Sequence, residues 1–159
     1  MKRYATELKW ALIFVVMSLL WMFMEKLLGW HDKHIDKHAY LTMIFMIPAI
    51  AVYVFALRDK RNNDLGGKMT WKQGFMSGLI ITLIVTLLSP LTQYITSKWI
   101  TPDYFKNVIN YTVEHGMKTM EEAQAYFNLE NYIVQSVIGA IVMGIITSAI
   151  VALFVRNSK

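Results

Sequence analysis

The stretch WKQGFMSGLIITLIVTLLSPLTQYITSKWI, which runs from Trp71 to Ile100, decides the fold of this chain. Its central part, Phe75 to Tyr94, contains no charged residue. An α-helix needs about 20 predominantly apolar residues to cross the hydrocarbon core of a bilayer, so this stretch is predicted to span a membrane. The composition agrees, because 55% of the 159 residues are hydrophobic, which is too apolar for an ordinary soluble domain.

Small residues recur at every fourth position in this stretch and in a second apolar stretch, Asn131 to Val155. Residues four apart lie on one face of a helix, and small side chains let another helix approach closely. The two stretches are therefore predicted to pack against each other, although a homodimer would use the same faces. The residues that carry this prediction are Gly74, Gly78, Ser136, Ala140, Gly144 and Ser148.

Two further apolar runs, at residues 10–28 and 40–57, precede these stretches. Together with spans at 74–97 and 132–155, they give four predicted transmembrane helices in a single domain of residues 1–159. The first run is longer than the apolar part of a secretory signal, and no cleavage site follows it, so a retained helix is expected. Proline residues inside the second and third spans are expected to kink them.

Residues 101–130 form the one sizeable segment between spans and are predicted to be an amphipathic helical hairpin. Thr101 is expected to cap its first helix through the side-chain hydroxyl, and Gly116 to end that helix. Thr119 and Glu122 have the spacing of a capping box at the start of the second helix. The predicted fold class is therefore an all-α integral membrane protein with four transmembrane helices and a hairpin between the third and the fourth.

Lysine and arginine are unevenly distributed between the two sides of the membrane, when the segments between four spans are assigned to alternate sides. The two chain ends and the connector from Arg58 to Lys72 fall on one side, and they hold more than half of the sixteen basic residues. Because basic residues near span ends favour the cytoplasmic side, both termini are predicted to be cytoplasmic. The connector is either a binding site for anionic head groups or a consequence of topology alone. No nucleic-acid partner is expected.

Four short motifs follow one another along the chain: Leu28-Gly29-Trp30-His31-Asp32, Asp64-Leu65-Gly66-Gly67, Thr70 to Phe75 and Ile100 to Phe105. In this order they resemble the domain-of-unknown-function 4199 (DUF4199) family, small bacterial membrane proteins found mainly in Bacteroidota with no assigned activity. The resemblance implies a place in the bacterial cytoplasmic (inner) membrane. Through the family's association with genes for lipid-linked glycosyl transfer, it also implies a partner in that chemistry. It carries over no catalytic or binding residue.

The connector after the first span contains side chains that commonly bind metal ions: His31, Asp32, His34 and His38. Imidazole and carboxylate groups suit zinc and similar ions. Polar turns of this length are also ordinary in solvent-facing connectors, and neighbouring lysines reduce the local negative charge. A metal site, an ordinary solvated turn and a pH-sensing role for the histidines are all compatible with the sequence.

Glu25 is the one acid within an apolar run. Ionisable residues inside a span are costly to bury and are therefore functional candidates. Because Glu25 lies near the end of the first span, the favoured interpretation is an interfacial carboxylate that reaches water or pairs with Lys26, His31 or the loop after the third span. The competing interpretation is a buried proton carrier.

The sequence contains no recognisable catalytic triad, catalytic carboxylate pair or nucleotide fingerprint, and it lacks cysteine. The leading hypothesis is a non-catalytic accessory or scaffold subunit without a cofactor, in contact with membrane lipids and with a protein partner or a second copy, which serves lipid or envelope-glycan enzymes. The alternative is a homo-oligomeric small transporter or lipid-handling protein that uses Glu25 and the outer histidines. A third is a membrane metalloenzyme built on His31, Asp32, His34 and His38.

Overall fold

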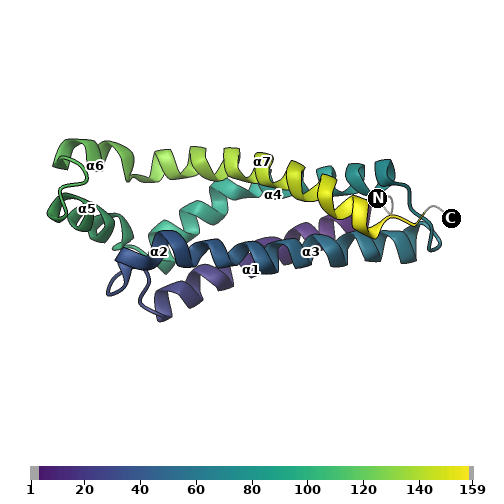
Figure 1. Ribbon diagram of the computed structural model, residues 1–159, viewed down its shortest axis with the longest axis horizontal. Coiled ribbons are helices and arrows are strands. Elements are labelled where there is room, and N and C mark those ends of the chain that lie inside the picture. Colours follow the sequence, from purple (N-terminus) through teal and green to yellow (C-terminus); the bar gives the residue numbers. More distant parts are fainter. Residues whose placement is uncertain (1–3, 158–159) are drawn as a thin grey trace.

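The computed structural model describes residues 4–157, and nearly all of them are helical (Figure 1). The first, third and fourth long helices are α1 (Ala5–Leu27), α4 (Trp71–Ile95), which a π-helical turn extends through Thr96–Ile100, and α7 (Leu129–Val155). The second is a continuous run of α2 (Ile35–Leu41), a 3-10 turn (Thr42–Phe45), α3 (Met46–Asp59) and a π-helical turn (Lys60–Asp64). Two short helices, α5 (Tyr104–Glu114) and α6 (Met120–Tyr126), connect α4 to α7.

Four helical segments within residues 4–157 are long and apolar enough to cross a membrane, which confirms the predicted fold class. Each is longer than its apolar run alone indicates, and the second extends from Ile35 to Asp64 instead of covering only residues 40–57. The reason is that backbone hydrogen bonds, which do not depend on apolar side chains, continue the helices past the apolar runs, at both ends of the second and third spans and at the first end of α1 and α7.

The long helices lie side by side along the length of the molecule. α4 packs most extensively against α7, while α1 contacts α3 and α4, and α3 contacts α7. Figure 1 shows α5, α6 and α2 at one end, and the start of α1, the end of α7 and the connector between α3 and α4 at the other. At this second end, Met69 and Asn157 exchange backbone hydrogen bonds of 2.9 Å.

The α4–α7 contact is closest where a glycine of one helix faces a hydroxyl-bearing side chain of the other. A Cβ atom at Gly78 would lie 2.5 Å from Oγ of Ser148, and a Cβ atom at Gly144 would lie 2.5 Å from Oγ1 of Thr82. Gly74 faces Ala152 in the same way, at 3.2 Å. Glycine is thus needed at Gly78 and Gly144 because the two backbones approach too closely for any side chain.

The hydroxyl groups at this contact are satisfied within their own helices. Thr82 donates to the carbonyl of Gly78 at 2.9 Å, and Ser148 donates to the carbonyl of Gly144 at 2.6 Å. The phenol of Tyr53 on α3 lies 2.9 Å from the Thr82 hydroxyl and links the second long helix to the α4–α7 pair. The other two predicted small residues, Ser136 and Ala140, are half-buried on α7 closer to α6.

The two prolines inside the long helices, Pro48 and Pro90, lie where the helical geometry changes. Pro90 cannot donate to the carbonyl of Thr86, and the hydroxyl of Ser89 donates to that carbonyl instead, at 2.8 Å. In Figure 1, α4 runs beside α7 on the right of the view and moves away from it towards the left. Pro48 follows the 3-10 turn Thr42–Phe45 and is the third residue of α3, so the helical geometry changes just before the position that lacks a backbone N–H.

The connection between α4 and α7 is helical, and its second helix begins as predicted. Thr119 and Glu122 form the expected capping box: the Thr119 hydroxyl accepts from the Glu122 backbone N–H at 3.2 Å, and the Glu122 carboxylate accepts from the Thr119 N–H at 2.9 Å. These hydrogen bonds lower the pKa of the Glu122 carboxyl below its ordinary value. Gly116, with a φ of +64°, follows the end of α5.

The predicted cap of α5 is wrong. The cap position is Asp103, which makes no side-chain capping bond, and α5 begins at Tyr104. The hydroxyl of Thr101 instead donates to the carbonyl of Thr96 at 3.3 Å, and its backbone N–H donates to the same carbonyl at 2.8 Å. Thr101 therefore closes the π-helical turn that ends the third long helix, because the carbonyl groups of that turn need donors too.

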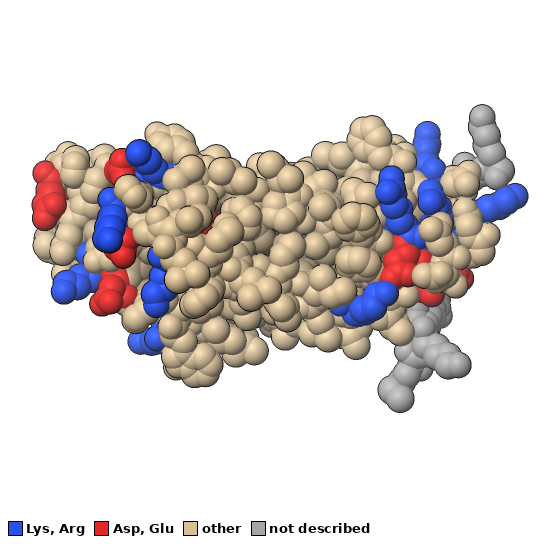
Figure 2. All heavy atoms as spheres, turned by 90° about the horizontal axis from the view of Figure 1, so that it is seen from below, with Lys and Arg blue, Asp and Glu red and all other residues tan. Residues whose placement is uncertain are grey.

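Charged side chains gather at the two ends of the molecule and leave a broad uncharged band between them (Figure 2). The band is the part of the surface formed by the middle of the long helices, where exposed residues such as Leu20, Ile47, Leu87 and Val142 are apolar. An exposed apolar band of this kind needs a hydrocarbon environment, and it agrees with four membrane-spanning helices.

Candidate functional site

A tight turn after α1 brings a polar cluster together at the α5 end of the molecule. Gly29 has a φ of +73°, and backbone hydrogen bonds of 3.0 Å run from Gly29 to Lys26 and from Trp30 to Glu25. This is the pattern of a helix that ends at a left-handed glycine and reverses. The reversal places His31 over the last turn of α1, next to Glu25.

Glu25 is the centre of this cluster and has no exposed surface. One carboxylate oxygen, Oε1, accepts a hydrogen bond from the indole N–H of Trp21 at 2.5 Å. The other, Oε2, lies 2.9 Å from Nε2 of His31 and 3.4 Å from Nε2 of His38. The side chain of Thr42 lies near the carboxylate. The carboxylate is therefore enclosed by groups from α1, the following turn, α2 and the 3-10 turn.

Residues of α5 close the cluster from outside. The phenol of Tyr104 lies 3.4 Å from Nδ1 of His38 and 3.2 Å from the phenol of Tyr132 on α7. The side-chain amide of Asn107 donates to the backbone carbonyl of His31 at 3.0 Å. Burial raises the pKa of the Tyr104 phenol above its ordinary value, so the phenol remains a neutral hydrogen-bonding group.

The candidate ligands taken from the sequence divide into two groups. His31 and His38 join Glu25, and one ligand atom from each of the three residues lies within 4.8 Å of the others. Asp32 and His34 are exposed and lie outside this group, and the Asp32 carboxylate accepts a hydrogen bond from the backbone N–H of Lys33. Residues 31–34 precede α2 as a non-helical turn, so their spacing does not put them on a common face.

Glu25 itself differs from the interfacial carboxylate that the sequence favours. It pairs with His31, which is one of the three expected partners, but its carboxylate does not reach the surface and Lys26 is exposed. The difference arises because α2 and α5 fold over the end of α1. The hydropathy pattern of α1 alone does not indicate that other helices cover its end.

A second buried polar cluster lies at the opposite end and was missed by the sequence reasoning. Glu7 is 1% exposed, and its Oε1 accepts from the Ser77 hydroxyl at 2.9 Å and lies 3.0 Å from Nζ of Lys60. Lys60 also pairs with Asp64 at 2.8 Å. Arg61 donates to the last carbonyl of α7, that of Val155, at 2.9 Å. Part of the basic connector therefore holds helices together at this end.

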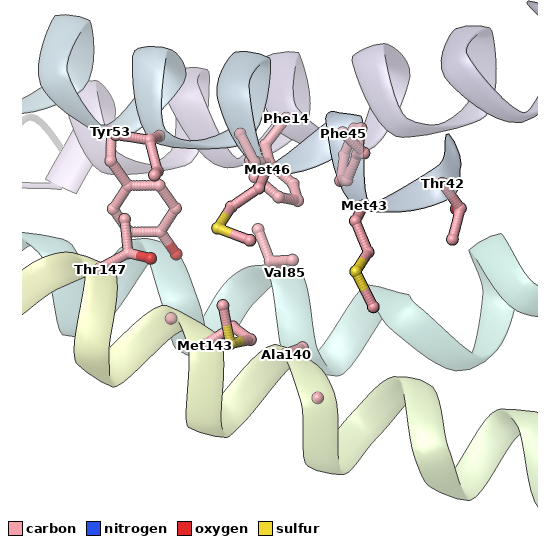
Figure 3. Close-up of a pocket in the computed structure, with 14 residues that line it drawn as sticks. Phe14, Thr42, Met43, Phe45, Met46, Tyr53, Val85, Ala140, Met143 and Thr147 are labelled. Atoms are coloured by element: carbon pink, nitrogen blue, oxygen red, sulfur yellow. The ribbon is translucent and has the colours of Figure 1, made fainter. Parts of the chain in front are cut away.

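Between the two clusters lies an apolar cavity of about 340 Å³. It is bounded by α1, the second long helix, α4 and α7, with Phe14, Met46, Val85 and Met143 among its lining residues (Figure 3). Gly139 of α7 also lines it, and a Cβ atom there would have no neighbour within 4 Å. Thr42 belongs both to the cavity wall and to the Glu25 cluster, so the two features adjoin.

Comparison of the sequence with protein families gives one match, which extends over residues 9–157. It includes all four long helices, the Glu25 cluster and the cavity. No curated protein and no solved structure matches the chain. Because the family match covers nearly the whole sequence, the chain belongs to the family described as protein of unknown function (DUF4199).

Proposed function

We propose that this protein is a non-catalytic, lipid-holding accessory subunit of the bacterial cytoplasmic membrane. In this proposal, the cavity between α3 and α7 takes up an acyl chain of a membrane lipid, and the bound lipid is presented to a partner enzyme that acts on lipids. The observation that carries the proposal is the cavity itself, an apolar space that lies inside the uncharged band and adjoins a buried polar cluster.

The cavity is accessible from the side of the molecule. Met43, Met46 and Ile50 on the second long helix and Met143 on α7 line it and are also exposed on the surface. In a bilayer, these residues face the hydrocarbon region, so an acyl chain enters without crossing a polar layer. Methionine side chains are flexible and adapt to chains of different shape, which suits a site for a lipid tail.

The size and chemistry of the cavity fit an acyl chain better than a polar solute. Small-molecule pockets commonly measure about 300–1,000 Å³, and a volume of about 340 Å³ lies at the lower end of that range. Apolar cavities do not stabilise water, because water needs two to four polar partners. The side chains of Thr42, Tyr53 and Thr147 are the few polar groups among the lining residues.

Replacing Gly139 with phenylalanine should prevent lipid retention, because the new side chain would fill the open space in front of its Cβ. Native mass spectrometry of the protein with added phosphatidylethanolamine measures the retained lipid directly. We expect roughly a tenfold loss of bound lipid, equivalent to about 1.4 kcal/mol of binding free energy.

The matched control is Ile138→Phe, because Ile138 is the preceding residue, is 56% exposed and does not line the cavity. Ile138→Phe should retain lipid as the unchanged protein does, and both variants should keep their helical circular dichroism. Equal retention by Gly139→Phe and the unchanged protein would reject the cavity as the lipid site. An equal loss in both variants would assign the lipid to the outer surface instead.

The orientation belongs to the same proposal. The charge distribution supports cytoplasmic termini, since the connector with Arg58, Lys60, Arg61, Lys68 and Lys72 is the most basic segment between spans. Of the other basic residues on that side, Lys2, Arg3 and Lys159 lie outside the described part of the chain.

A cysteine placed at Lys68 should be protected from a membrane-impermeant maleimide in intact spheroplasts, and one at Glu121 should be labelled. Both positions are exposed, and the natural chain has no cysteine to interfere. After lysis, both should react, which controls for accessibility. Labelling of Lys68→Cys alone in intact spheroplasts would invert the proposed orientation.

A homo-oligomeric lipid transporter is the second candidate, and the position of Thr42 favours it. Thr42 lines the cavity and also lies near the Glu25 carboxylate, so a moving head group would meet a polar cluster at the end of an apolar path. The same mass spectra distinguish the two candidates. A heteromer released from its own membrane supports the accessory role, and a lipid-bound homo-oligomer supports transport.

A further inference from the structure

We infer that Glu25, His31 and His38 form a binding site for a divalent transition-metal ion of the zinc class. The site is separate from the acyl-chain cavity, and the inference does not depend on the proposed function. It rests on the convergence of one carboxylate and two imidazoles in a buried position, on the hydrogen bonds that orient them, and on the lack of a lysine or arginine in the cluster.

The distances between the three side chains fit a shared ion. Zinc lies about 2.0–2.2 Å from nitrogen and oxygen ligands, so two ligands of a tetrahedral ion are separated by about 3.3–3.6 Å. Nε2 of His31 and Nε2 of His38 lie 2.9 and 3.4 Å from the same oxygen, Oε2 of Glu25. Nε2 of His31 lies closer to Oε2 than this separation, and the ligand atoms of the three residues all lie within 4.8 Å of one another, so movements of about 1 Å or less in the two imidazoles place one ion between the three.

The charge of the cluster also favours a cation. Glu25 is fully buried, and an ionised carboxylate in such a place needs a positive partner. Within residues 4–157, its ion pairs are with the two imidazoles, and the nearby lysines Lys26, Lys33 and Lys37 are exposed. A divalent ion bound by neutral imidazoles satisfies the carboxylate without requiring a protonated histidine.

Hydrogen bonds around Glu25 and His38 point to the same arrangement, whereas Nδ1 of His31 is buried and has no hydrogen-bond partner within residues 4–157. A metal-binding imidazole keeps its proton on the nitrogen that faces away from the metal, where a second group usually accepts it. Nδ1 of His38 faces the phenol of Tyr104, while its Nε2 is buried, makes no hydrogen bond within the described chain and points to Glu25. On Glu25, Trp21 occupies Oε1 and leaves Oε2 to the histidines.

The ligand types narrow the class of ion. Two imidazoles and one carboxylate suit zinc, cobalt or nickel, whereas magnesium and calcium prefer shells made of oxygen. Three protein ligands leave a coordination position for water or a ligand oxygen.

The test uses the full-length protein in a mild detergent, stripped with a chelator and titrated with Co²⁺ and then with Zn²⁺. We expect one saturable Co²⁺ site per chain with the visible absorption of a four- or five-coordinate ion, and loss of that absorption when Zn²⁺ displaces it. His38→Gln should weaken binding by at least about 100-fold, because it removes a direct ligand. His34→Gln and Asp32→Asn are matched controls, since both residues lie in the same connector but outside the cluster, and both should bind as the unchanged protein does.

The unchanged protein decides the inference even if a variant folds poorly. Failure to bind Co²⁺ or Zn²⁺ with a defined stoichiometry, or a six-coordinate aqueous spectrum, would overturn it. An equal loss of affinity in His34→Gln and His38→Gln would also overturn it, because surface histidines would then account for the binding. Circular dichroism of each variant without metal shows whether its helices are intact.

Discussion

Replacing Gly144 with valine is expected to destabilise the protein more than any other single change to its small residues. A Cβ atom at Gly144 would lie 2.5 Å from Oγ1 of Thr82, and the Thr82 hydroxyl is already fixed by its bond to Gly78. Overpacking of a close contact costs about 1–3 kcal/mol and sometimes more. We expect a loss of at least about 3 kcal/mol, measured as the shift of the unfolding midpoint in mixed detergent micelles.

Gly139→Val is the matched control for this prediction, because both glycines lie inside α7 and the intrinsic helical preference changes equally. A Cβ atom at Gly139 meets nothing within 4 Å, so its variant should stay within about 1 kcal/mol of the unchanged protein. Similar losses in the two variants would show that helix propensity, and not the approach of α4 to α7, governs the result.

Replacing Lys60 with methionine should have the second large effect, because it leaves the Glu7 carboxylate buried without its cation. Glu7 is 1% exposed, and Nζ of Lys60 lies 3.0 Å from it. Removal of one partner from a buried ion pair costs about 3–5 kcal/mol, since the remaining charge is uncompensated. The unfolding midpoint should fall accordingly.

Two further variants separate this effect from a general loss of packing. Adding Glu7→Gln to Lys60→Met removes the uncompensated charge and should recover most of the stability. Asp64→Asn breaks only the more exposed half of the cluster and should cost about 0.5 kcal/mol. A double variant as unstable as Lys60→Met alone would contradict the electrostatic explanation.

The long helices and the α4–α7 contact could be predicted because each depends on a regular pattern along one helix. An apolar run sets a span, and small residues at every fourth position mark a face that a neighbour approaches. Gly78 and Gly144 lie at that contact in the structure. The predicted ends of the spans were less accurate than the spans themselves, because hydropathy does not indicate where helical hydrogen bonding stops.

The polar clusters could be predicted only in part because they depend on turns and on contacts between distant segments. His31 and His38 were in the candidate set, but spacing cannot reveal that the turn at Gly29 directs His31 inward and leaves His34 outside. The buried ion pair of Glu7 and Lys60 could not be predicted from the sequence, since charged residues near the ends of spans are expected for topology alone. Gly139 lines a cavity, yet in the sequence it is indistinguishable from a packing glycine.

The hydroxyl groups at the α4–α7 contact donate hydrogen bonds within their own helices, and this affects how the protein can enter the membrane. Because Thr82 and Ser148 bond carbonyl groups of their own helices, each helix can be inserted alone without an unsatisfied hydroxyl at this contact. α1 is different, since the partners of Glu7 and of Oε2 of Glu25 lie in segments synthesised later. Its two carboxyl groups are therefore expected to stay close to water until the rest of the chain leaves the ribosome and assembles around them.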